Sequence, residues 1–240
     1  MEESSVIHLY YCGLGEESAQ ALAKEITKQG ATVELQWQKD GVFEHGKNDL
    51  CVNWGARCKE VNGKWLNRGV FHNKLKQLQW LAEEKIPTVE FDLKPGEGKW
   101  YARKKKHHDG SDLEGIVPHP DYFVKHVDVK EEYRAHVFKG EVLRFSLKTQ
   151  SEEFLEPGEK INPKFKIGNG WVFSNKNYKD SVGQPLRDAA VAAVAALGYD
   201  FGGVDIATTN IGPVVFEVNS APWLGGEMQR EYAKRIIALA

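Results

Sequence analysis

The sequence predicts an α+β protein whose N-terminal part has α/β character. A strand, a helix and a second strand follow one another near the N-terminus, which is typical of a βαβ unit. In the middle of the chain, two strand patterns meet at a short turn and predict a hairpin. The C-terminal part adds an alanine-rich helix at residues 186–197, a second hairpin at residues 204–219 and an amphipathic helix at residues 227–239.

The N-terminal βαβ unit is recognised by its spacing. Residues 6–11 form a β-rich run, and residues 31–38 alternate as a second strand. The helix between them, residues 16–28, carries apolar side chains at helical spacing. Gly13 and Gly15 follow the first strand, but the third glycine of a dinucleotide-binding fingerprint is missing, so we interpret them as a tight turn.

Strand and helix patterns continue to alternate after this unit. Residues 49–54 read as a strand, residues 71–84 as a helix with a stripe of leucines, and residues 88–91 as another strand. A strand pattern at residues 99–105 then runs into a basic loop at residues 104–112. Backbone amides and cations in this loop could cover a phosphate, because its glycine allows close approach. Taken alone, the loop is more simply a solvated charged segment.

The middle hairpin joins residues 131–138 to residues 141–148. Side chains alternate along a strand, so Glu132, Arg134 and His136 share one face. Such a face could bind a ribose and a phosphate. A surface ion pair is the simpler interpretation of this hairpin alone, and such a pair contributes little to stability.

The second hairpin places acids together. A turn centred near Ile211 would set Asp205 opposite Glu217, and Asn219 points the same way as Glu217. Oxygen-only ligands of this kind suit Mg²⁺. The alternative is an edge hairpin with a polar, solvated face, but the residues that flank the acids are too apolar for that.

Composition limits the functional classes. The 240 residues are 41% hydrophobic and 28% charged, which is ordinary for a globular protein. A net charge of −2 argues against capture of nucleic acid or of an anionic membrane. Three cysteines without zinc-site spacing predict free thiols in a reducing compartment. The N-terminus lacks a signal sequence, so we expect a cytoplasmic protein with no nucleic-acid or membrane partner.

Several short motifs, in order, resemble those of the ATP-grasp carboxylate–amine ligases. The C-terminal part carries LGYDFGGVDIA and then GPVVFEVNSAPWLGG. Upstream motifs are Asn53-Trp54-Gly55, Leu66-Asn67, Asn73-Lys74-Leu75, Trp100-Tyr101-Ala102-Arg103, His108-Asp109-Gly110, Gly115-Ile116, Glu132-Tyr133-Arg134, Val137-Phe138-Lys139-Gly140 and Gly170-Trp171-Val172-Phe173. The resemblance is greatest to ribosomal-protein glutamate ligases and to short phage and bacterial ligases.

The resemblance implies the ATP-grasp fold, with the nucleotide held between two α+β subdomains. It implies a short βαβ N-terminal region over residues 1–70 and a central subdomain with a phosphate flap over residues 71–125. A C-terminal subdomain with the magnesium site would cover residues 126–240. The flap itself would be residues 106–113.

The resemblance also implies roles for single residues. Asp205, Glu217 and Asn219 would hold two Mg²⁺. Cofactor-binding residues would include Lys74 and Arg103 at the phosphates and Glu132 at the ribose. The backbone around Lys125, His126 and Val127 would read the adenine. Lys148 and Arg134 would face the γ-phosphate or an acyl phosphate, as catalytic residues.

The implied activity is an ATP-dependent ligase that forms an amide or peptide bond through an acyl phosphate and releases ADP and phosphate. Its partners would be small-molecule or peptide carboxylate and amine substrates. An ATP-grasp small-molecule kinase and a non-catalytic ATP-binding regulatory module are the alternatives. Trp223 could stack on a substrate or simply pack. The sequence leaves open the two substrates and the oligomeric state, a homo-oligomer included.

Overall fold

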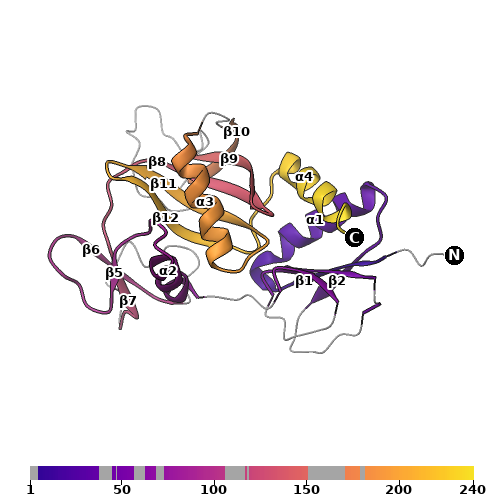
Figure 1. Cartoon of the computed structure of the whole chain (residues 1–240), viewed down its shortest axis with the longest axis horizontal. Coiled ribbons are helices and arrows are strands. Elements are labelled where there is room, and N and C mark those ends of the chain that lie inside the picture. The colour runs from indigo at the N-terminus through magenta and orange to yellow at the C-terminus, as the bar shows by residue number, and fades with distance from the viewer. Residues whose placement is uncertain are drawn as a thin grey trace.

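The computed structural model describes residues 5–37, 45–46, 48–56, 63–68, 73–105, 117, 119–150, 171–178 and 182–240. These residues form three β-sheets, four α-helices and one 3-10 helix (Figure 1). The loop expected at 104–112 is described only as far as residue 105, and the flap at 106–113, its Gly115-Ile116 continuation and Gly170 lie outside the described residues.

The N-terminal sheet has the strand order β2-β1-β3-β4, and all of its pairs are parallel. Its elements are β1 (Ile7–Tyr11), η1 (Gly13–Gly15), α1 (Glu16–Lys28), β2 (Val33–Trp37), β3 (Leu50–Trp54) and β4 (Lys64–Leu66). The predicted βαβ unit is confirmed, because β1 and β2 pair in parallel and α1 connects them. The two glycines after β1 form the short η1 turn that leads directly into α1.

The central element of the fold is an antiparallel five-stranded sheet with the order β10-β9-β8-β11-β12. Its strands are β8 (Val129–Phe138), β9 (Glu141–Gln150), β10 (Trp171–Tyr178), β11 (Phe201–Thr209) and β12 (Gly212–Asn219). The alanine-rich helix α3 (Gln184–Ala196) lies across one face, and its small side chains allow it to approach the sheet closely (Figure 1).

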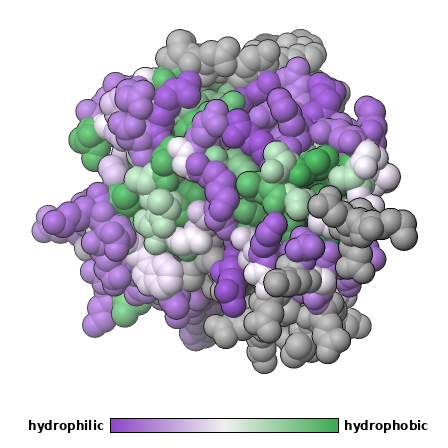
Figure 2. Space-filling view, turned by 45° about the vertical axis from the view of Figure 1, so that its right-hand side comes forward, coloured by the Kyte–Doolittle hydropathy of each residue, from purple (hydrophilic) through white to green (hydrophobic). Residues whose placement is uncertain are grey.

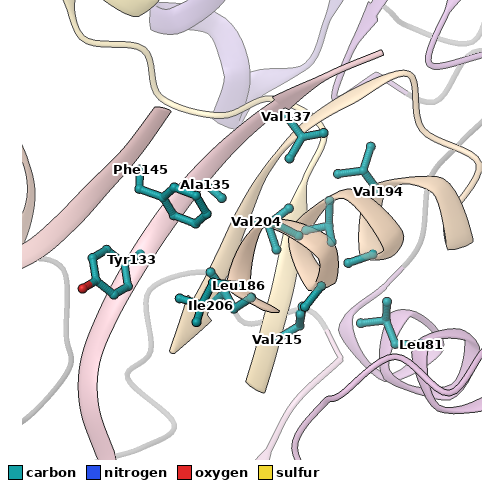
Figure 3. Packing of buried hydrophobic residues seen from close by; sticks show 14 of the residues in the cluster. Leu81, Tyr133, Ala135, Val137, Phe145, Leu186, Val194, Val204, Ile206 and Val215 are labelled. Carbon is teal, nitrogen blue, oxygen red and sulfur yellow. The ribbon is translucent and has the colours of Figure 1, made fainter. Parts of the chain in front are cut away.

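That face of the five-stranded sheet is mainly apolar where α3 covers it. Side chains from β8, β9, β11 and β12 interdigitate with those of α3 in one core, as Figure 3 shows for Tyr133, Ala135, Val204 and Val194. Because side chains alternate along a strand, the polar residues between these positions point to the opposite face. The sheet therefore separates an apolar core from a face that carries charged side chains.

A third, three-stranded sheet has the order β5-β7-β6 and is antiparallel. It consists of β5 (Phe91–Asp92), β6 (Trp100–Arg103) and β7 (Tyr122–Lys125). The helix α2 (Lys74–Glu83) joins it to the edge of the five-stranded sheet through one apolar cluster. The predicted leucine stripe divides between two cores: Leu75 and Leu78 belong to this cluster, and Leu81 belongs to the α3 core.

The strand expected at residues 88–91 is replaced by the two-residue strand β5, because Thr88 pairs with the five-stranded sheet instead. Thr88 forms an isolated parallel bridge to Val215 of β12 and donates its hydroxyl to the Val215 carbonyl at 2.8 Å. The amide of Val215 in turn donates to the Pro87 carbonyl at 2.8 Å. Residues 87–88 thus cover the backbone of β12, which is an edge strand and would otherwise expose these groups.

The C-terminal helix α4 (Gly226–Ile237) returns to the N-terminal sheet and runs beside α1 (Figure 1). Tyr232 lies at the centre of this contact, with its ring edge-on to the rings of Trp54, Phe138 and Phe201. The N-terminal sheet and the base of the five-stranded sheet therefore share one hydrophobic core.

Surface hydropathy is uneven. On the face seen in Figure 2, hydrophobic residues form a band across the middle, with mostly hydrophilic residues on either side. None of the helices in the described ranges is long and apolar enough to cross a membrane.

Asn67 joins the N-terminal sheet to β11. It is fully buried, its φ is 56°, and its main-chain amide donates to the Asp200 carboxylate at 2.6 Å. Its side-chain oxygen accepts from the amides of Asp200 at 2.7 Å and Phe201 at 3.1 Å, and its side-chain nitrogen donates to the Phe201 carbonyl at 3.0 Å. A positive φ is tolerated by asparagine better than by most other residues.

Replacing Asn67 with alanine should lower the free energy of unfolding by about 2 to 4 kcal/mol, because buried amides lose their acceptor and alanine is strained at positive φ. Urea denaturation measures the change. Asn210→Ala, at an exposed turn position, is the matched control and should change stability by less than about 0.5 kcal/mol. Equal effects of the two substitutions would show that Asn67 does not join the sheets.

Candidate active site

Asp205 and Glu217 face each other on β11 and β12, as predicted. The register reaches this pairing through a β-bulge. Ile206 pairs with Val215, whereas Asp205 pairs with Glu217, so Phe216 is an extra residue on β12. Without that extra residue Asp205 would face Phe216, and the two acids would not be cross-strand partners.

The turn explains why the bulge is needed. Thr209 pairs with Gly212, so the turn consists of Asn210 and Ile211 and its centre lies half a residue before the predicted position. The predicted pairing of the acids is therefore correct, but its expected cause, a turn centred on Ile211 with an unbroken register, is wrong. The bulge restores the register at the acids.

Three ion pairs occupy the charged face of the five-stranded sheet. Arg134 binds Asp205 with two hydrogen bonds, from Nε at 2.7 Å and from a terminal nitrogen at 2.8 Å. Lys148 Nζ lies 2.9 Å and 3.0 Å from the two carboxylate oxygens of Glu132. The third pair joins the Lys74 ammonium to the Glu217 carboxylate at 2.7 Å. Acids and cations predicted from separate motifs are thus brought together.

Strand register produces the first two pairs. Arg134 lies directly opposite Asp205 in the β8–β11 ladder, and β8 and β9 form the predicted hairpin that carries Glu132 and Lys148. The sequence of the hairpin, taken alone, is most simply interpreted as carrying a surface ion pair, and that interpretation is wrong. In the structure these pairs are buried, because Glu132, Arg134 and Asp205 are each at most 8% exposed.

The third pair depends on a residue that the sequence analysis did not identify. Gln77 of α2 donates its side-chain nitrogen to the Val218 carbonyl at 2.9 Å and accepts from the Val218 amide at 3.0 Å. Its side chain thus pairs with the backbone of edge strand β12 and holds the start of α2 beside Glu217. The signal available in the sequence was a polar residue between the leucines of an apolar stripe.

The start of α2 is set by its cap. The helix was expected from residue 71, but it begins at Lys74 because Asn73 caps it and accepts from the Lys76 amide at 3.0 Å. Residues 71–72 lie outside the described residues. The cap places Lys74 in the first turn of the helix, directed to Glu217.

Phe173 of β10 is a second residue that the sequence analysis missed as part of the site. Its ring lies 4.3 Å from the Arg134 guanidinium and 5.6 Å from the Lys148 ammonium. A ring face attracts cations, so Phe173 orders both side chains. Gly203 makes room beside them, because a Cβ there would come within 2.7 Å of Pro222 and 3.3 Å of the Arg134 stem.

The two glutamates of the site have pKa values that are far apart. Burial raises the pKa of Glu132 to about 7, although Lys148 opposes the shift. Burial also disfavours the charged form of Glu217, but the Lys74 ammonium and its hydrogen bond outweigh it and hold the pKa at about 2. Burial raises the pKa of Asp205, against the effect of Arg134. Glu132 is therefore close to the midpoint of its titration at neutral pH.

His136 shares the face of Glu132 and Arg134, as predicted, but it belongs to the interior. Its ring packs edge-on against Tyr232. Burial, followed by the nearby arginines, lowers its pKa to about 3, so the imidazole is neutral. It therefore offers no positive charge to a phosphate.

The donor set around Glu217 fits Mg²⁺. Asp205, Glu217 and Asn219 contribute oxygen ligands only, and the Asn219 side-chain nitrogen donates to Glu217 at 3.2 Å, so the three side chains converge. Three cations stand within the same group of contacts, which is the complement that an anionic phosphate chain needs.

The remaining predicted cofactor-binding residues lie on, or just after, strands of the three-stranded sheet. Arg103 ends β6, and Lys125 ends β7 and pairs with Glu90 at 2.8 Å. His126 contacts the Tyr101 hydroxyl at 3.0 Å, and Val127 packs in the cluster that joins this sheet to α2 and β12. These residues therefore belong to the three-stranded sheet, which the same cluster joins to α2 and β12.

The backbone of this segment is partly engaged. The Lys125 amide donates to the Glu90 carbonyl and the His126 amide donates to the Lys99 carbonyl, both at 2.8 Å. An adenine ring would have to use other groups of the segment than these two amides.

Trp223 follows the acids in the chain and is 55% exposed. The residue two positions before it, Ala221, packs against Gly15 and Gly55, where a Cβ on either glycine would lie 3.1 Å or 2.8 Å from the Ala221 methyl group. The chain therefore passes from the acids to the ends of β1 and β3, and packing does not cover most of the indole.

Comparison with known proteins identifies the fold. The ATP-grasp ligase PsnB complexed with a minimal precursor has a TM-score of 0.65 at 11% identity, covering 99% of this chain and 100% of that chain. D-alanine–D-alanine ligase from Bacillus anthracis complexed with ATP has a TM-score of 0.65 at 13% identity, covering 99% and 96%. A RimK domain ATP-grasp protein from Sphaerobacter thermophilus has a TM-score of 0.61 at 15% identity, covering 99% of each chain.

Sequence comparison finds a shorter match. A probable alpha-L-glutamate ligase of Shewanella oneidensis is 55% identical over 40 residues, which are 17% of this chain and 13% of that relative. No protein-family model matches the chain. The chain has the ATP-grasp fold, so the predicted fold class and the resemblance to ATP-grasp proteins are confirmed.

Glu132 should titrate with a pKa of about 7, which carboxyl-carbon NMR would measure as a signal that is absent from the Glu132→Gln variant. The folded state then keeps a proton that the unfolded chain loses near its ordinary value of 4.5. Stability should therefore fall as pH rises, by about 2 to 3 kcal/mol between pH 5 and pH 8, and the fall should be smaller in the variant. A titration below pH 5 would contradict this.

Proposed function

We propose that this chain, which has the ATP-grasp fold, is an ATP-dependent ligase that joins a carboxylate to an amine in an amide or peptide bond. The observation that carries the proposal is the alternation of three acids with three cations on one face of the five-stranded sheet. Metal ligands and phosphate-binding cations are both needed for phosphoryl transfer. The solved ATP-grasp structures named with ATP, or with Mg and ADP, support this choice of cofactors.

Nucleotide binding would exchange the partners of these ion pairs. Asp205, Glu217 and Asn219 would hold Mg²⁺, two ions in our proposal, because their oxygens suit it. Lys74, once released from Glu217, would reach the phosphates. Asp205 and Glu217 would then each trade a cation for a metal ion, and the released cations would each trade a carboxylate for a phosphate.

The other predicted residues complete this nucleotide site. Arg103 would contact the phosphates, and Glu132, released from Lys148, would accept from the ribose hydroxyls. The backbone around Lys125, His126 and Val127 would contact the adenine. The nucleotide would then lie between the central part, residues 71–125, and the C-terminal part, residues 126–240. Residues 1–70 would contribute to the acceptor side, where Ala221 contacts Gly15 and Gly55.

The chemistry has two steps. A carboxylate oxygen of the substrate attacks the γ-phosphorus, the bond to the bridging oxygen breaks, and ADP leaves. The amine then attacks the carbonyl carbon of the acyl phosphate, inorganic phosphate leaves with the bonding electron pair, and the amine loses a proton. Bound Mg²⁺ would neutralise charge on the phosphate oxygens.

Lys148 and Arg134 would act as the catalytic cations. Their ammonium and guanidinium groups stabilise the charge that builds up on the transferred phosphoryl group, and Phe173 keeps both oriented. Lys148 is 6% exposed, so its charge is little screened by water.

The substrates would be a small-molecule or peptide carboxylate and an amine. The named relatives include a probable alpha-L-glutamate ligase, a D-alanine–D-alanine ligase and an ATP-grasp ligase complexed with a precursor peptide, which supports that substrate class. Trp223, more than half exposed beyond the metal ligands, would stack on the acceptor.

Glu217→Gln should reduce ATP turnover by about 100-fold or more, because a metal ligand loses its charge while the side chain keeps its size. Release of ADP and phosphate, with pooled amino acids and peptides as substrates, measures it. Glu227→Gln is the matched control, since Glu227 forms an exposed ion pair with Arg144. That variant should retain activity, and thermal unfolding should show that both variants fold.

The products separate the proposal from its alternatives. Hydroxylamine should intercept the acyl phosphate as a hydroxamate. AMP and pyrophosphate as products would exclude the mechanism, and a stable phosphoester would indicate a kinase. ATP binding without ADP formation, with every acceptor tested, would indicate a regulatory module.

A further inference from the structure

A second cluster of ligand-type side chains lies on the N-terminal sheet. Ile7 and Leu9 of β1 face the core shared with α1 and α4. His8 and Tyr10 alternate with them and therefore face the other side of the sheet. There His8 meets His45 and Asp49, and these three residues each offer one ligand atom within 4.8 Å of the others.

The spacing within this cluster suits a metal ion. His8 Nε2 and Asp49 Oδ2 are 3.1 Å apart, and the two imidazole rings have centroids 4.5 Å apart. Ligands on a tetrahedral zinc ion are roughly 3.3 Å from one another, given metal–ligand bonds of about 2.0 to 2.1 Å. The His8–Asp49 edge already has about that length, so only His45 would have to move closer.

The two imidazole nitrogens of His45 differ in their hydrogen bonding. Its Nε2 contacts the Tyr10 hydroxyl at 2.6 Å, whereas its Nδ1 is buried and has no hydrogen-bond partner among the described residues. A buried polar atom without a partner costs stability, so it calls for an explanation. A metal ion at Nδ1 supplies one.

Each of the three ligands has a polar group behind it. Glu34, which pairs with His8 in the β1–β2 register, places a carboxylate oxygen 3.3 Å from His8 Nδ1, without the alignment of a hydrogen bond, and Nε2 is the ring nitrogen that faces Asp49. Tyr10 plays the same part for His45. Carboxylate and hydroxyl groups behind metal-bound histidines are a common feature of zinc sites.

Asp49 is the best-anchored member of the cluster. Its Oδ1 accepts from the Val6 amide at 3.0 Å, and its Oδ2 accepts from the Gly46 amide at 2.7 Å. The hydrogen bond from the Val6 amide is the largest of the effects that lower the pKa of Asp49, so the carboxylate is ionised. The residue is therefore fixed and charged before any metal arrives.

We propose that His8, His45 and Asp49 bind a divalent first-row transition metal, with Zn²⁺ the preferred ion. Two imidazoles and one carboxylate are a zinc-type donor set, and they differ from the oxygen-only set that Mg²⁺ prefers. This site is distinct from the nucleotide site and independent of the proposed ligase activity. It would tie β1 to the segment before β3, and so stabilise the N-terminal sheet.

No sequence motif predicts this site. His8 and Asp49 are 41 residues apart in the chain and meet only because β1 and β3 are parallel neighbours. His45 and Asp49 are only four residues apart, as close zinc-ligand pairs can be, but a single histidine–aspartate pair is too common to predict a site.

Calorimetric titration of the metal-free protein with Zn²⁺, in the absence of nucleotide, tests the proposal. We expect one Zn²⁺ per chain and a rise in the melting temperature, both lost in His45→Ala and Asp49→Asn. Co²⁺ bound in place of Zn²⁺ should give the intense visible absorption of a tetrahedral site. Glu217→Gln should bind Zn²⁺ normally, so failure of the ligase proposal would not affect this test.

Outer-partner variants test the geometry without removing a ligand. Tyr10→Phe and Glu34→Gln should each weaken Zn²⁺ binding by about 10- to 100-fold. His119→Asn, at an exposed histidine with a positive φ of 52°, is the control for surface binding and should change nothing. Zinc affinity that is unchanged in His45→Ala, or reduced equally in His119→Asn, would overturn the proposal.

Discussion

Burial of charge is the constraint on which the charged face of the five-stranded sheet depends. Removing a carboxylate from water without a counter-charge costs of the order of several kcal/mol, so each buried acid needs a cation. Asp205 receives one from β8, Glu132 from β9 and Glu217 from α2. Sheet register and helix position are therefore linked, because a one-residue slip would turn a partner to the apolar side that packs on α3.

The same pairing makes the face suitable for binding. Buried ion pairs contribute little net stability, since desolvation offsets most of their attraction. They can therefore be exchanged at small cost when a ligand brings opposite charges of its own. The environment also gives the two glutamates different pKa values. Burial raises the pKa of Glu132 to about 7, whereas Glu217 stays charged beside Lys74. The acid with the low pKa is the one suited to hold a metal ion.

The N-terminal sheet uses its two faces for different purposes. One face joins the base of the five-stranded sheet in a core built around Tyr232, and Asn67 adds a set of hydrogen bonds to that junction. The other face collects His8, Tyr10 and His45. The return of α4 to this sheet places the C-terminal helix beside α1 (Figure 1).

Local pattern alone determined much of this protein. Alternation and helical spacing predicted the βαβ unit and both hairpins, because these depend on neighbours in the chain. The pairing of Asp205 with Glu217 was also predicted, but it holds only because of a bulge that the sequence analysis did not foresee. Only the tertiary structure decided the bulge at Phe216, the contact of Gln77 with Val218, the ring of Phe173 and the meeting of His8 with Asp49. Each of these joins residues from different elements, and such contacts are set by packing between elements, which leaves no periodic signal in the sequence.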